Sequence, residues 1–432
     1  MSTRVRGRFI VSPLSQPSAT ASQQLIAAST VEFVLTLGRA LHRYGAPAHR
    51  LEEGLLDVCR RLGVQAEVFS TPTAIIMSFG DPGELRTRMM RVEGGELDMS
   101  KLARVDALAD AVASRQMSPA DGVRELAAIL ASRRAFGHGL STLAHGMTAG
   151  SVAVFIGGAL ADVAIAALIG LSVGLLAQYA RRSTDQARVF ELVGSAFASF
   201  AAGIASAMWY ATSYSIVIVA ALLILLPGLS LTVAMTELAT RNLIAGTARL
   251  MSAVIVLLQL AVGVALGEKA ASALVQVHSA IPVALPEWAR WVALAASAVG
   301  VSIIAQAQPR SFGWIAAACT VGYVGSRAGT TWLGGPSGTQ MSGPLGVLVG
   351  AFALGVLSNI YARRFKRPAE VVSVPAVLLL VPGSTGFQSM ASLLDRDTLS
   401  GVDGVFATFI AAIGIVAGLL IANAVVSPRR RV

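Results

Sequence analysis

The chain has 432 residues, of which 54% are hydrophobic and 13% are charged, and its mean hydropathy is +0.67. Soluble domains carry about a quarter charged residues, so this composition excludes an ordinary soluble enzyme and indicates a polytopic membrane protein. The net charge of +10 would suggest nucleic-acid binding in a soluble protein. No aromatic and basic nucleic-acid surface accompanies it, so no nucleic-acid partner is expected.

Residues 1–27 are predicted to be a disordered cytoplasmic tail. They are rich in Arg, Ser, Thr, Gln and Pro, and they lack the continuous apolar stretch of about 7 to 15 residues that a signal peptide needs. An organelle transit peptide is the alternative for such an Arg-rich start. Cys59 and Cys319 are too few and too isolated for a disulfide framework or a zinc site, so neither a cofactor nor a metal is expected.

Residues 28–134 hold most of the acidic residues and are predicted to form a small cytoplasmic α+β domain. Apolar residues recur at helical spacing before Pro47, and a second amphipathic helix is expected at 48–62. The expected strands are 64–70, 73–79 and 84–92, and the expected closing helices are 101–115 and 119–131.

One face of the helix at 48–62 could carry chemistry. His49, Glu52 and Glu53 are spaced to share that face, which is compatible with metal binding or acid–base catalysis. Without a second ligand cluster, however, a solvated charged face is the favoured interpretation. No nucleophile motif is present, so the chain is not expected to be an enzyme.

After residue 134 the chain is almost entirely apolar. It contains ten segments near the length of about 20 residues that spans a bilayer as a helix. The segments are 139–158, 161–180, 189–209, 214–234, 248–267, 289–307, 311–326, 343–361, 371–388 and 403–424. They predict a membrane region of two five-helix halves, 139–267 and 289–426.

The basic residues of the loops test this count. With the front domain in the cytoplasm, thirteen basic residues fall on the inner side and four on the outer side. The inner ones are Arg181, Arg182, Arg188, Arg241, Arg249, Arg310, Arg363, Arg364, Lys366, Arg367, Arg429, Arg430 and Arg431, and the outer ones are Lys269, Arg290, Arg327 and Arg396. This asymmetry follows the positive-inside rule and predicts that both termini are cytoplasmic.

A Pro-Gly pair interrupts the fourth and the ninth segment. Residues 223–228 read LILLPG and residues 378–383 read LLLVPG. Because each half has an odd number of crossings, matching positions indicate two inverted repeats, as in many secondary transporters. A Pro-Gly break leaves backbone groups that lipid cannot satisfy, so such breaks face protein or a cavity. A simple proline kink is the alternative.

Hydroxyl residues follow each break, where a new half-helix would expose amides suited to a substrate carboxylate. The predicted substrate-binding residues are Pro227, Gly228, Ser230, Thr232, Pro382, Gly383, Ser384 and Thr385. The segment 334–343 reads GGPSGTQMSG, but it lacks the lysine of a phosphate loop, so nucleotide binding is rejected.

Polar residues inside the apolar segments are the remaining candidates, because burying them in a membrane is costly. Glu191 and Glu237 are the predicted proton-coupling residues. Snorkelling of Glu191 toward Arg188, and an i+4 pair of Glu237 with Arg241, are the structural alternatives. Asn359 and Gln388 are secondary candidates that could instead hydrogen-bond across helices.

Two front-domain stretches, GRALHRYGAPAHRLEE at 38–53 and EVFSTPTAIIMSFG at 67–80, resemble the threonine/serine exporter (ThrE) family. The ten-segment remainder with its two Pro-Gly pairs is similar to that family as well, so the resemblance covers residues 28–426. Matching positions of the front-domain motif are Gly45, Ala46, Arg50, Glu52, Thr71, Pro72 and Thr73.

This resemblance implies proton-driven export of threonine and serine across a prokaryotic inner membrane. The implied partners are these small molecules, protons and the lipid bilayer, with a possible homo-oligomer. Relatives split into two chains are linked to dicarboxylate export, so a succinate-like substrate is one alternative. A membrane-anchored hydrolase with the front domain as catalytic unit is another.

Overall fold

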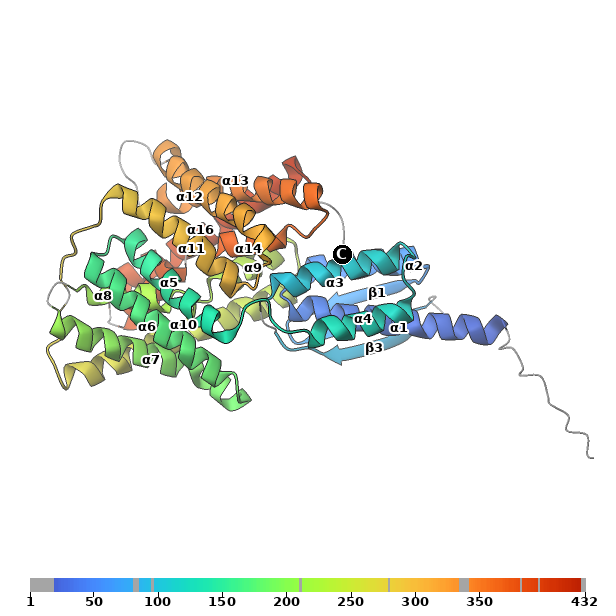
Figure 1. Cartoon of the computed structure of the whole chain (residues 1–432), viewed down its shortest axis with the longest axis horizontal. Helices are drawn as coiled ribbons and strands as arrows, with labels where there is room; N and C mark the ends of the chain where they lie inside the picture. The colour runs from blue at the N-terminus through green and yellow to red at the C-terminus, as the bar shows by residue number, and fades with distance from the viewer. Residues whose placement is uncertain are drawn as a thin grey trace, which may run out of the picture.

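The computed structural model describes residues 19–80, 85–94, 97–209, 212–278, 280–333, 342–380, 383–394 and 397–428. Figure 1 shows a smaller front part, which carries the strands, lying at one end of a larger helical part. The glycine-rich segment 334–341 and Pro382 lie outside the described residues.

The front part contains four helices and three strands. They are α1 (Ala19–Arg43), α2 (Ala48–Leu62), β1 (Ala66–Ser70), β2 (Ala74–Phe79), β3 (Arg86–Arg91), α3 (Met99–Ala113) and α4 (Pro119–Ala131). The strands form an antiparallel sheet in the order β1-β2-β3. Helix α1 begins at Ala19, so the last residues of the predicted disordered tail are helical, which their Ala and Gln content favours.

One face of the sheet is buried beneath α1 and α2. Ile75, Met77 and Phe79 of β2 alternate with less buried neighbours, as expected for a strand with one face in the core. A Cβ at Gly38 of α1 would lie 3.1 Å from Leu55 Cδ1 of α2, so glycine allows the two helices to approach closely. The edge strand β3 is mostly exposed and carries three arginines, which discourages pairing with another chain.

The helical part has a helix, or a divided helix, at each of the ten predicted segments. The undivided ones are α5 (His138–Ile156), α6 (Leu160–Ala180), α7 (Thr184–Met208), α10 (Leu243–Ser272), α11 (Glu287–Ile304), α12 (Phe312–Leu333), α13 (Ser342–Phe365) and α16 (Thr398–Val425). Within the described residues, seven of them are long and apolar enough to cross a membrane, and α12 is not among the seven. The protein is therefore mostly helical with at least these seven candidate spans.

The fourth and ninth segments are each divided into two helices, the second of which begins at the glycine of the Pro-Gly sequence. The fourth consists of α8 (Tyr214–Leu222) and α9 (Gly228–Ala239), and the ninth of α14 (Glu370–Val377) and α15 (Gly383–Leu394). Pro227 cannot donate a backbone hydrogen bond, so the helix stops before it and α9 begins at the glycine that follows. None of these four short helices could span a bilayer alone.

Small residues bring the long helices together. On α10, a Cβ at Gly267 would overlap the Ala196 carbonyl oxygen of α7. On α16, a Cβ at Gly418 would lie 2.5 Å from the Leu348 carbonyl oxygen of α13. Glycine at such crossings is typical of membrane helices, whose association depends on close packing rather than on the hydrophobic effect.

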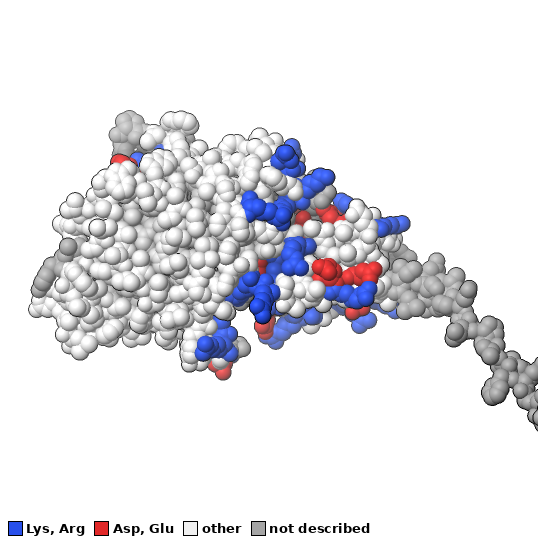
Figure 2. All heavy atoms as spheres, viewed as in Figure 1, with Lys and Arg blue, Asp and Glu red and all other residues white. Residues whose placement is uncertain are grey.

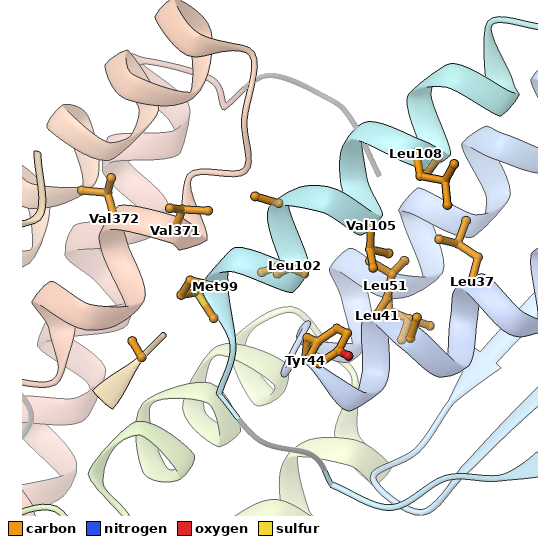
Figure 3. Packing of buried hydrophobic residues seen from close by; sticks show 14 of the residues in the cluster. Leu37, Leu41, Tyr44, Leu51, Met99, Leu102, Val105, Leu108, Val371 and Val372 are labelled. Carbon is orange, nitrogen blue, oxygen red and sulfur yellow. The ribbon is translucent and has the colours of Figure 1, made fainter. Parts of the chain in front are cut away.

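The front and helical parts share one hydrophobic core. Figure 3 shows Met99 and Leu102 of α3 next to Val371 and Val372 of α14, and Leu41 of α1 and Leu51 of α2 belong to the same cluster. Backbone hydrogen bonds reinforce this junction, because Met99 N–H donates to the Ala305 carbonyl at 2.9 Å. The front part is therefore docked on the helices rather than tethered to them by a linker.

Candidate functional site

The two Pro-Gly breaks lie against each other. A Cβ added to Gly383 would lie 3.1 Å from Leu226 Cβ and 3.6 Å from Gly228 Cα, so residues more than 150 positions apart meet with only glycine between them. Helices α9 and α15 both begin at this crossing, and their first amides have no partner within their own helix. The crossing thus brings together the positive ends of two helix dipoles.

The predicted substrate residues take different places around this crossing. Thr232 is buried and lines a cavity, and its hydroxyl donates to the Gly228 carbonyl at 3.2 Å. Ser230 and Thr385 are half-buried, and neither lines that cavity. Pro382 and the side chain of Ser384 lie outside the described residues.

The cavity has a volume of about 120 Å³ and lies between α2, α9, α13, α14 and α16. Its deep end reaches Leu229 of α9 and Val377 of α14, next to the two breaks. Its wall contains six uncharged side chains that can form hydrogen bonds: Thr232, Thr236, Ser358, Asn359, Ser373 and Asn423. A mostly apolar cavity with a few polar groups is the usual form of a small-molecule site.

The start of α2 in the front part covers the other end of this cavity. Pro47, His49 and Arg50 line it there together with Glu370, the first residue of α14. An Arg50 guanidinium nitrogen lies 3.5 Å from a Glu370 carboxylate oxygen, and the two side chains are 29% and 21% exposed. Two opposite charges, one from each part of the protein, therefore face the same cavity.

The turn before α2 explains Gly45. This residue has a φ of +83°, in the left-handed region that favours glycine, and its N–H donates to the His42 carbonyl at 3.1 Å. Pro47 then occupies the N-cap position, with an extended backbone. This turn directs the free N–H groups of α2 toward the helical part.

Glu237, near the end of α9, receives the first of those N–H groups. Its carboxylate is fully buried and accepts a hydrogen bond of 3.1 Å from the Ala48 amide. Arg249 of α10 donates two further hydrogen bonds of 3.0 and 3.1 Å to the same carboxylate. The i+4 pair with Arg241 does not form, because Arg241 lies beyond the end of α9 with a φ of +66°.

The other motif residues shape the neighbouring sheet edge. Thr71 closes the turn between β1 and β2: its hydroxyl donates to the Ala74 carbonyl at 3.1 Å and accepts from the Ala74 amide at 3.0 Å. Pro72 follows within this turn, where its fixed φ is favourable. Glu52 of α2 accepts a hydrogen bond of 2.7 Å from the Ser70 amide, which ties α2 to β1.

Three titratable groups of the front part have shifted pKa values. Burial lowers the pKa of His42, and Arg249 lowers it further, while a hydrogen bond with the Thr71 backbone and the charge of Glu237 oppose the shift. Burial and Arg50 lower the pKa of His49. Burial raises the pKa of Glu52 against the hydrogen bond from Ser70. The neutral form of both histidines is therefore favoured relative to a histidine in water.

The remaining candidates lie away from this junction or have partners of their own. Glu191 is half-buried on α7, and Arg188 forms its ion pair with Asp185 at 3.4 Å instead. Asn359 donates to Asn423 Oδ1 at 2.9 Å and to the Val426 carbonyl at 2.8 Å, which joins α13 to the end of α16. Gln388 is exposed on α15.

Sequence reasoning missed Glu370, Arg249 and Asn423. Glu370 directly precedes an apolar segment, and Arg249 was assigned only to a loop, so neither had a local signal for a partner far along the chain. Among the described residues, no group of three His, Cys, Asp or Glu side chains is close enough to hold a metal ion.

Comparison with known proteins covers both halves of the chain. Residues 32–271 match one model of the threonine/serine exporter family, and residues 290–425 match a second model, described as threonine/serine exporter, ThrE. No solved structure matches.

Curated relatives include membrane proteins of fungi. The pheromone-regulated membrane protein 10 of Eremothecium gossypii is 29% identical over 370 residues, which is 84% of this chain and 49% of the relative. Its counterpart in Saccharomyces cerevisiae is 30% identical over 376 residues, which is 84% of this chain and 47% of the relative. The chain thus spans about half the length of these relatives. With one family model covering more than half of the chain and a second covering most of the rest, the chain belongs to the threonine/serine exporter family.

Proposed function

We propose that the protein is a secondary active exporter of small hydroxylated amino acids, threonine and serine, coupled to protons. The observation that carries this proposal is the contact between the two breaks, beside a cavity of about 120 Å³. Paired broken helices next to a central cavity are the arrangement in which many secondary transporters hold their substrate. A simple anchor for an enzyme needs neither feature.

The proposed membrane region has ten crossings in two inverted repeats. In the first half, the third and fifth segments are α7 and α10, which cross at Gly263 and Gly267. In the second half, the third and fifth segments are α13 and α16, which cross at Gly355 and Gly418. The same pair of segments thus packs through glycine in each half, and the divided helix precedes the last segment in both.

The proposed location is the cytoplasmic membrane of a prokaryote, with both termini inside the cell. Figure 2 shows basic side chains concentrated on the front part and on the end of the helical part next to it, while the far end in this view carries few charges. This distribution supports a cytoplasmic front part through the positive-inside rule. The curated relatives are fungal, so the membrane itself is part of the proposal.

Glu237 and Glu191 are the proposed proton-coupling residues. Glu237 supports this role best, because its buried carboxylate joins the divided helix α9 to both α10 and the front part. Protonation would weaken both contacts at once. Glu191 is tested by Glu191→Gln: unchanged transport driven by a pH gradient would remove it as a candidate.

The test of this function is efflux of labelled threonine from proteoliposomes that contain only the purified protein. Efflux should rise when a pH gradient is imposed, and serine should compete with threonine. Succinate is run in parallel, because movement of succinate alone would replace the amino-acid substrate with a dicarboxylate. Liposomes without protein give the leak rate.

A further inference from the structure

The ion pair between Arg50 and Glu370, which lines the cavity, differs from the ion pair between Glu237 and Arg249, which helps to attach the front part. Arg50 and Glu370 approach at a single contact of 3.5 Å, longer than the roughly 2.7 to 2.9 Å of a good charge-assisted hydrogen bond. Both side chains keep between a fifth and a third of their surface exposed. This pair is loose and accessible from the cavity.

The ion pair between Glu237 and Arg249 has shorter contacts, and its carboxylate is buried. Glu237 is 0% exposed and holds Arg249 through two hydrogen bonds of 3.0 and 3.1 Å, with the Ala48 amide as a third donor. Attachment of α2 to the helical part is thus already provided by Glu237. The Arg50–Glu370 contact is not needed for that purpose.

His49, the neighbour of Arg50 in the chain, has a ring nitrogen without a hydrogen-bond partner in the part of the chain that the structure describes. Its Nδ1 is buried and has no hydrogen-bond partner among the described residues, although His49 lines the same cavity as Arg50 and Glu370. Buried polar atoms in folded proteins nearly always have a partner. The described residues thus leave one polar atom without a partner beside the Arg50–Glu370 pair.

We infer that this cavity binds the free amino acid as a zwitterion, with its carboxylate on Arg50 and its ammonium group on Glu370. Inserting the molecule replaces one 3.5 Å contact with two charge-assisted ones and leaves no buried charge unpaired. This inference rests on the proposed export function, and it makes the front part a direct contributor to substrate recognition.

The hydroxyl groups on the cavity wall suit the side chain of threonine or serine. Thr232, Thr236 and Ser358 each donate their hydroxyl hydrogen to a carbonyl of their own helix, at 3.2, 2.9 and 2.8 Å. Their oxygens are left as acceptors for a substrate hydroxyl. A site that hydrogen-bonds a substrate hydroxyl discriminates strongly against molecules that lack one.

The experiment compares three probes on the purified full-length protein: L-threonine, 1-amino-2-propanol, which lacks the carboxylate, and 3-hydroxybutyrate, which lacks the amine. Binding is measured by ligand-induced thermal stabilisation in detergent, and inhibition of threonine efflux is measured in proteoliposomes. The native protein should bind each one-charge probe at least about tenfold more weakly than threonine, the effect of losing one charge-assisted hydrogen bond.

In Arg50→Gln the advantage of threonine over 1-amino-2-propanol should fall to about threefold or less, while its advantage over 3-hydroxybutyrate persists. In Glu370→Gln, the advantage of threonine over 3-hydroxybutyrate should fall, while its advantage over 1-amino-2-propanol persists. Arg50→Lys keeps a cation and should retain the carboxylate preference. Arg60→Gln is the matched control, because Arg60 lies on the same helix with a side chain that is 75% exposed, and it should change neither ratio.

The ratios are taken within one variant, so a general loss of stability does not affect them. Equal weakening of all three probes in both variants would show that the pair is only structural, and would overturn the inference while leaving the export function standing. If the native protein neither binds nor moves threonine, the proposed function fails first, before the variants are compared.

Discussion

At the scale of single residues, Glu237 is a side chain that contacts both parts of the protein. Its carboxylate accepts from Ala48 of the front part and from Arg249 of the helical part, and it is fully buried. Removing one partner of such a pair leaves the other partner without compensation. Glu237 therefore attaches α2 to the helical part and neutralises the charge of Arg249 on α10.

Glu237→Gln is expected to destabilise the protein by about 3 kcal/mol, the lower end for a broken buried pair, because the Arg249 side chain is 27% exposed and keeps some solvent. The measurement is the midpoint of thermal unfolding in detergent. Glu53→Gln, at an exposed position on α2, is the control and should leave the midpoint nearly unchanged. Equal midpoints for both variants would contradict the role given to Glu237.

The two front-part histidines predict a pH dependence. Their folded-state pKa values are lowered, so the unfolded chain binds protons more readily than the folded one, and stability falls as the pH drops through about 6.5. The midpoint of thermal unfolding should therefore decrease between pH 7.5 and pH 5.5. The decrease should be smaller in the His42→Gln, His49→Gln variant, whereas His138→Gln, at an exposed position, should behave like the native protein.

At the scale of secondary structure, much of the arrangement is predictable from local patterns. The helix expected at 48–62 is α2 with the same bounds, because Pro47 sets its start and Gly63, with a φ of +76°, sets its end. The two Pro-Gly pairs divide the fourth and ninth segments as predicted. Turn residues and helix breakers act locally, so one sequence is enough to locate them.

What could not be predicted is which of these elements meet. The contact of Gly228 with Gly383 and the bond from Ala48 to Glu237 join residues far apart in the chain, and no local pattern encodes such contacts. The structural alternative considered for Glu237 was a pair with the i+4 arginine, because only neighbours within one helix can be judged from spacing. Arg249 and Glu370 were missed for the same reason.

The contact between the breaks predicts that Gly383→Leu abolishes efflux while the protein still reaches the membrane. Even its Cβ would lie 3.1 Å from Leu226 Cβ, so the longer side chain must separate the two divided helices. Efflux in proteoliposomes and the amount of protein in membranes are the two measurements. Gly313→Leu is the matched control, since a Cβ at Gly313 has no neighbour within 4 Å. Normal efflux from Gly383→Leu would exclude the crossing as the centre of transport.

At the scale of the whole molecule, the chain has one natural division that is not the boundary of the front part. Helix α10 ends at Ser272 and α11 begins at Glu287, and the two family models match on either side of this connection. The shared core nevertheless includes residues from both sides, such as Leu37 and Met99 before it and Val372 after it.

Two pieces of the chain, separated by a cut within residues 280–286, should therefore associate into one complex. When the two pieces are co-produced with different affinity tags, purification of one should recover the other, because the core and the hydrogen bond from the Met99 amide to the Ala305 carbonyl cross the cut. A cut in the middle of α7 is the control and should give no complex, since it divides a membrane helix. Pieces that purify separately after the first cut would contradict the shared core.

The shared core also has a consequence for how the protein is made. Met99 and Leu102 leave the ribosome roughly 270 residues before Val371 and Val372, the side chains that cover them in the finished protein. At a synthesis rate of about 5 to 20 residues per second, this apolar face of the nascent front part remains exposed for roughly 15 to 55 s. During that interval the ribosome-bound chain presents a surface suited to chaperones, and slowing translation after α4 should lengthen the time that they stay bound.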